Sequence, residues 1–162
     1  MILNKLRQTM PSSPYSFQDR FQNINRIVII YPKNQKWLRI AKYALQRMYN
    51  LPERFEYLLF VPPDSTTPEL NIEHEYVEMN YAPRLEDRIT IANRIISFDP
   101  DILLQLEPEP GELLVKLIRQ LDIPLKMGFG DEESDLNVIY SQGESGFYEK
   151  NILNLIALLE MK

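Results

Sequence analysis

The chain has 162 residues, a net charge of −5 and no cysteine. This length suits one well-buried domain and is short for two, and a composition of 44% hydrophobic and 25% charged residues argues against wholesale disorder. The acidic balance disfavours a nucleic-acid or anionic-membrane partner, and the lack of cysteine excludes disulfides, thiol nucleophiles and cysteine-ligated metals.

The beginning of the chain carries no export or membrane signal. The first residues lack the apolar core of a signal peptide, and no run approaches the roughly 20 apolar residues of a membrane span. We therefore expect a cytoplasmic protein without a membrane span. Residues 1–23 are polar with scattered apolar positions, which predicts an N-terminal arm with one short helix over 17–23.

The first predicted strand covers residues 26–31, a β-branched run that ends at Pro32. Apolar residues at helical spacing from Trp37 onward predict a helix that stops at Asn50 and Pro52. A second strand is expected over 56–61 and a third, weaker strand over 74–80.

The second half of the chain begins with a predicted helix over 84–98. Its apolar stripe is expected to consist of Leu85, Ile89, Ala92 and Ile96. Next comes a β-α-β unit, with strands over 101–106 and 125–129 and a helix over 113–121. A short strand over 137–140 and a helix over 147–161 complete the order.

Alternating strands and helices predict an α/β fold. We expect a Rossmann-like three-layer α/β/α domain over residues 24–162, with a mainly parallel sheet of five or six strands. Ligands of such sheets bind at the carboxyl ends of the strands, near the switch in strand order. The candidate ligand-binding residues at these ends are Lys33, Asn34, Lys36, Glu107, Glu109, Gly128 and Gly130.

The loop after the first strand, YPKNQK, has no glycine. Backbone approach to a pyrophosphate depends on glycines at this place, so NAD and FAD are disfavoured and we expect no cofactor. Lys33, Lys36, Arg39 and Lys42 could hold a phosphate or an acidic headgroup. A solvated helix face is the preferred interpretation of these four residues.

The carboxylates of Glu107, Glu109 and Glu112 are predicted to be stabilised by the first turn of the following helix, with Pro110 at its first position. A metal site or an acid/base pair is the alternative. The only histidine, His74, makes no convincing triad with Ser134 and Asp135, and residues 131–135 are interpreted as a solvated acidic loop. We therefore assign neither catalytic nor metal-binding residues.

Four segments together resemble the N-terminal half of the family 9 glycosyltransferases, the lipopolysaccharide heptosyltransferase type. They are INRIVIIYP, FDPDILLQLEPEP, LDIPLKMGFG and FYEKNILNLIALLEM. The resemblance covers roughly residues 24–160 and implies a GT-B N-terminal-like domain. The family's Gly-Asp turn after the first strand, which supplies a candidate base, is replaced here by residues 31–35, YPKNQ. No catalytic aspartate carries over.

The chain also ends where the second, donor-binding half of such enzymes would begin. The resemblance therefore implies a stand-alone, degenerate relative that lacks transferase activity and acts by binding or association. Its partner would be another protein or a second copy, and its ligand a sugar or sugar phosphate. Two alternatives stay open. One is an acceptor-binding half that works with a separate donor-binding chain, and the other is a small phosphate-binding hydrolase that uses Lys33, Lys36 and the 107–112 loop.

Overall fold

The computed structural model describes residues 26–45, 55–62, 75–78, 85–130, 134–140 and 145–160. The expected arm over 1–23, the end of the first long helix and His74 lie outside these ranges. The described elements, in chain order, are β1 (Arg26–Ile30), α3 (Gln35–Leu45), β2 (Glu56–Val61), β3 (Glu75–Glu78), α4 (Leu85–Phe98), β4 (Ile102–Gln105), α5 (Glu112–Gln120), β5 (Leu125–Phe129), β6 (Val138–Tyr140) and α6 (Ser145–Glu160).

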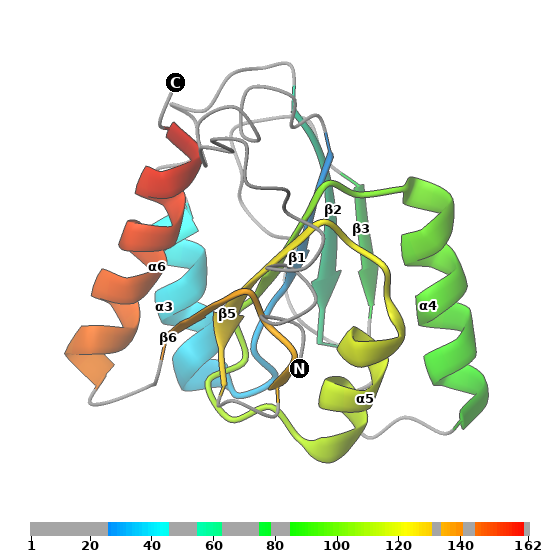
Figure 1. The fold of residues 1–162 in the computed structure, drawn as a ribbon. Coiled ribbons are helices and arrows are strands. Elements are labelled where there is room, and N and C mark those ends of the chain that lie inside the picture. Colours follow the sequence, from blue (N-terminus) through cyan, green and yellow to red (C-terminus); the bar gives the residue numbers. More distant parts are fainter. Residues whose placement is uncertain are drawn as a thin grey trace.

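The strands form one sheet of six strands in the order β3-β2-β1-β4-β5-β6, and every pairing is parallel. This confirms the predicted Rossmann-like α/β class. The strand order switches at β1, which pairs with β2 on one side and with β4 on the other. The carboxyl ends of the strands lie at the lower edge of the sheet in Figure 1, where the arrowheads of β2 and β3 point.

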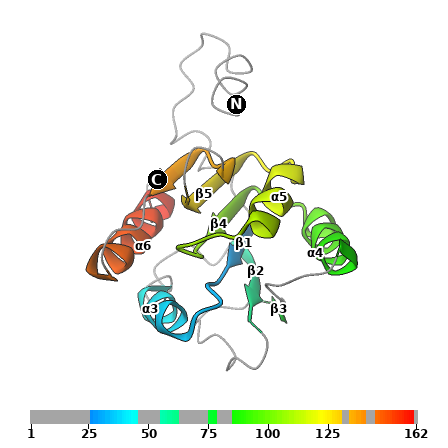
Figure 2. The same cartoon turned by 90° about the horizontal axis from the view of Figure 1, so that it is seen from below.

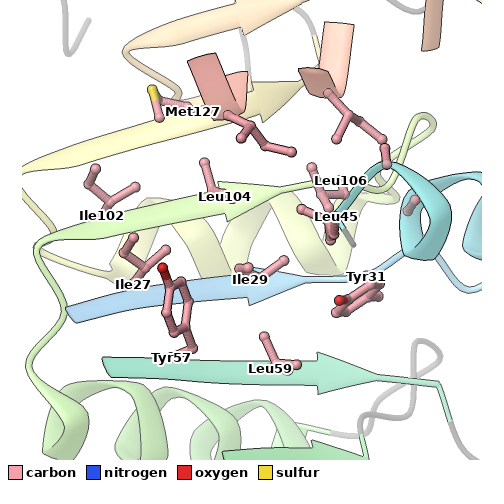
Figure 3. Close-up of a cluster of buried hydrophobic side chains, with 14 of the residues drawn as sticks. Ile27, Ile29, Tyr31, Leu45, Tyr57, Leu59, Ile102, Leu104, Leu106 and Met127 are labelled. Carbon is pink, nitrogen blue, oxygen red and sulfur yellow. The ribbon is translucent and has the colours of Figure 1, made fainter. Parts of the chain in front are cut away.

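Helices cover both faces of the sheet. Figures 1 and 2 show α3 and α6 on one face and α4 and α5 on the other. Because successive strand residues point to opposite faces, Ile27 and Ile29 join the core under α3 and α6, whereas Val28 and Ile30 join the core under α4 and α5. Figure 3 shows the first of these cores. Burial on both faces explains why the strands are continuous apolar runs.

The expected apolar stripe of α4 holds only in part, because Ala92 packs against the core but two other members do not. Ile89 and Ile96 are 52% and 62% exposed, and Ile91 and Ile95 are buried instead. Two apolar series at helical spacing overlap in this helix, and the sequence alone does not say which one faces the sheet. The observed rotation also brings Arg94 into an ion pair with Glu75 of β3.

Within the described residues, no helix has both the length and the apolar character needed to cross a bilayer.

Candidate functional site at the carboxyl edge of the sheet

The switch in strand order brings the chain segments after β1 and β4 together. Beyond the strands, the Leu106 N–H still donates to the Ile30 carbonyl oxygen at 2.9 Å, so the two segments stay paired for one more residue. The chain then leaves toward α3 on one face and toward α5 on the other. Parallel α/β sheets bind ligands at such a divergence.

Glu107 joins these two segments. Its side chain is almost completely buried, with 4% of the residue exposed. The Oε2 atom accepts a hydrogen bond from the Lys33 N–H at 2.8 Å, and Oε1 accepts one from the Glu109 N–H at 3.3 Å. Burial raises the pKa of this carboxyl, while the two N–H groups and the charge of Lys33 lower it in part.

The predicted capping role of these carboxylates needs correction. Helix α5 begins at Glu112 with Gly111 as its N-cap, so Pro110 precedes the cap and does not occupy the first helical position. Glu112 does lie in the first turn, where its carboxylate pairs with Lys116 at 3.0 Å and its pKa is lowered by that lysine. Glu107 binds the backbone of two loops, not the helix.

Gln105, which the sequence analysis missed, fixes the backbone around Glu107. It is fully buried, and its Nε2 donates to the carbonyl oxygens of Glu107 and Phe129, both at 2.9 Å. Its Oε1 accepts the Glu107 N–H. One amide therefore links the ends of β4 and β5. The available signal was a single amide within the apolar run ILLQL, at a position that a two-sided parallel sheet buries.

Gly128 and Gly130 line the same edge but serve close packing. Gly128 has φ +154°, and a Cβ there would lie 2.0 Å from the Gln105 carbonyl oxygen. Gly130 has φ +157°, and a Cβ there would lie 2.2 Å from the Ser134 Oγ. A side chain fits at neither position, so the missing side chains allow β5 to approach the Gln105 backbone at Gly128 and Ser134 to approach Gly130.

Three of the candidate residues are exposed here, Lys33 and Asn34 in the turn between β1 and α3 and Lys36 in the first turn of α3. The Asn34 Oδ1 accepts the Lys36 N–H at 2.9 Å and so caps the start of α3. The Lys36 Nζ lies 4.9 Å from the centre of the Trp37 ring, within cation–π range. Exposed lysines at this turn agree with the preferred interpretation of a solvated helix face.

Aromatic side chains of α3, α6 and β5 pack together next to this edge. The ring centre of Tyr148 on α6 lies 4.9 Å from that of Trp37 and 4.8 Å from that of Phe129. Its hydroxyl donates to the Leu106 carbonyl oxygen at 2.6 Å. Tyr148 thereby ties the last helix to the segment that carries Glu107, a link that no sequence pattern indicated.

The acidic segment 131–135 is not simply solvated at its described end. Asp135 is partly buried, and its Oδ2 lies 3.6 Å from the Nζ of Lys126, a residue that is 3% exposed. The Lys126 Nζ also donates to the Ile118 carbonyl oxygen near the end of α5, at 2.8 Å. Burial lowers the pKa of Lys126, and the negative charge of Asp135 raises it in part.

Over the ranges that the structure describes, no cluster of three or more His, Asp or Glu could hold a metal.

No protein-family model matches the chain, and no curated protein matches it in sequence. Two solved structures are similar in fold. E. coli heptosyltransferase WaaC, solved with ADP, superposes with a TM-score of 0.58 at 13% identity over 82% of this chain and 46% of that chain. A family 9 glycosyltransferase from Veillonella parvula superposes with a TM-score of 0.57 at 14% identity over 85% of this chain and 42% of that one. The fold is heptosyltransferase-like.

The likeness covers less than half the length of each solved structure, 46% and 42%. The structural comparison agrees with the family suggested by the four sequence segments. At 13% and 14% identity, this likeness is a likeness of fold. Within this heptosyltransferase-like fold, the turn after β1 carries Lys33 and Asn34, and the carboxylate of the buried Glu107 accepts the Lys33 N–H there.

Proposed function

We propose that the chain is a heptosyltransferase-like binding domain that holds a ligand or a partner at the carboxyl edge of its sheet and transfers no sugar on its own. The observation that carries the proposal is the meeting of Lys33 and Glu107 at the switch in strand order, the place where parallel α/β sheets bind ligands. The proposed ligand is a sugar or a sugar phosphate, and the proposed partner is another protein or a second copy of the chain.

The state of Glu107 supports the absence of transfer. A catalytic base has to reach the proton that it removes. Both oxygens of this carboxylate accept backbone N–H groups, and the residue is 4% exposed. The segment after β1, residues 31–36, offers two lysine ammonium groups and the amides of Asn34 and Gln35, but no carboxylate.

Thermal unfolding in the presence of nucleotides, sugar phosphates and ADP- or UDP-sugars tests the proposal, because a ligand that binds the folded state raises Tm with concentration. A double replacement of Lys33 and Lys36 by alanine should weaken that rise. Replacing Arg119, an exposed residue in the last turn of α5 at the opposite edge, removes one positive charge and is the charge-matched control for each single lysine replacement. Turnover of any sugar donor by the isolated chain would contradict the proposal.

A second candidate is an acceptor-binding half that works with a separate donor-binding chain. It is favoured by the coverage of only 46% and 42% of the solved structures. It predicts a copurifying protein with a nucleotide-sugar-binding domain, and sugar transfer only when both chains are present. A strictly monomeric protein that gains no activity from any copurifying chain would count against it.

A further inference from the structure

The turn between β1 and α3 has the position at which doubly wound sheets receive a phosphate. There the first N–H groups of the helix point away from the strand and attract an anion. In this chain two N–H groups of that turn are already bound by side chains. The Lys33 N–H donates to the Glu107 carboxylate at 2.8 Å, and the Lys36 N–H donates to the Asn34 Oδ1 at 2.9 Å.

Glu107 is held firmly in this position. Its second carboxylate oxygen accepts the Glu109 N–H, and the fully buried amide of Gln105 binds both the N–H and the carbonyl of Glu107. An ionised carboxylate only accepts hydrogen bonds, so its contacts with two N–H groups match those of a bound anion. With 4% of Glu107 exposed, water does not compete strongly for these bonds.

We infer that Glu107 is a built-in anion that fills the position where this class of fold receives the phosphate of a ligand, and that it closes the β1–α3 turn to anions from solution. One consequence rests on the proposed binding function. A sugar at this edge carries no phosphate next to the turn, since a phosphate there would meet the Glu107 carboxylate. Such a phosphate could interact only with the exposed ammonium groups of Lys33 and Lys36, and water and salt screen that attraction.

Replacing Glu107 with alanine in the full chain tests the inference. The variant loses the internal anion, so inorganic phosphate or acetate should occupy the vacated place and raise Tm. A rise of about 3–6 °C is expected at roughly ten times the Kd. Sodium chloride at equal ionic strength controls for screening. The wild type and Glu109→Ala, which alters an exposed carboxylate of the same loop, should respond to phosphate no more than to chloride.

A measurement on the wild type covers the case in which Glu107→Ala does not fold. The backbone amide resonance of Lys33 should shift when the Glu107 carboxyl titrates and should stay unchanged when phosphate is added. A saturable shift of this amide with phosphate would overturn the inference, as would a folded Glu107→Ala without a phosphate- or acetate-specific rise in Tm. Failure of every sugar to bind would instead contradict the proposed function and leave these results unaffected.

Discussion

Replacing Gln105 with leucine removes the amide that links the ends of β4 and β5 and keeps a side chain of similar bulk. Three buried backbone groups then lose their partner: the N–H and carbonyl of Glu107 and the carbonyl of Phe129. A buried polar group without a partner costs roughly 1–2 kcal/mol, so the three predict a loss of about 3–6 kcal/mol in unfolding free energy. This is a large share of the roughly 5–15 kcal/mol of a typical domain.

Urea denaturation measures this loss directly, and the single tryptophan, Trp37, which packs against the core under α3 and α6, provides a fluorescence signal. With a slope of about 2 kcal/mol per M, the midpoint should fall by roughly 1.5–3 M. Gln120→Leu at the exposed end of α5 makes the same chemical change and should alter stability by no more than about 0.5 kcal/mol. Equal midpoints for the two variants would refute the proposed role of Gln105.

Three further predictions concern the same edge and the neighbouring core. Gly128→Ala should destabilise the protein by more than about 3 kcal/mol because the added Cβ meets the backbone of the adjacent strand. Gly111→Ala, whose Cβ would have no atom within 4 Å, should cost about 1 kcal/mol or less. Similar losses of stability for the two variants in thermal unfolding would refute this prediction. Tyr148→Phe should cost about 1–2 kcal/mol because the hydrogen bond of its hydroxyl is lost. Tyr57→Phe should be neutral or slightly stabilising, since the buried Tyr57 hydroxyl has no hydrogen-bond partner in the described part of the chain. A larger loss of stability for Tyr57→Phe than for Tyr148→Phe in urea denaturation would contradict this prediction. Burial raises the pKa of Glu107, so the folded state holds this proton more tightly than the unfolded one, and the carboxyl's stabilising contribution is lost as pH rises from about 4.5 through the folded value. Glu107→Gln should flatten that part of the profile of stability against pH, and an unchanged profile would show that Glu107 does not titrate this way.

Most of the fold was predictable because the strands are continuous apolar runs separated by helical patterns. Two of these strands, 56–61 and 125–129, have the predicted bounds. The buried face of α4 was not predictable in the same way. Ile89 and Ile96 are seven residues apart and Ile91 and Ile95 are four apart, and both separations place a pair on one helix face. Only the packing against the sheet and the pairing of Arg94 with Glu75 distinguish the two pairs.

The candidate site was predictable in position but not in its interactions. Ends of parallel strands meet at one edge, so Lys33 and Glu107 were both expected at the carboxyl edge. Their hydrogen bond joins residues 74 positions apart, and local sequence suggested helix capping instead. Gln105, Tyr148 and Lys126 were missed because a polar or aromatic residue in an apolar segment does not reveal which backbone group it binds.

The central claim is that the carboxyl edge around β1, β4 and β5 binds the ligand. Backbone amide spectra of the full chain, recorded with free sugars, sugar phosphates and ADP- or UDP-sugars in turn, test this claim most directly. The account predicts that at least one of these compounds causes saturable shifts confined to residues 33–36, 107–109 and 128–130. Saturable shifts that leave these residues unchanged and follow another surface, such as the exposed side of α4, would contradict it.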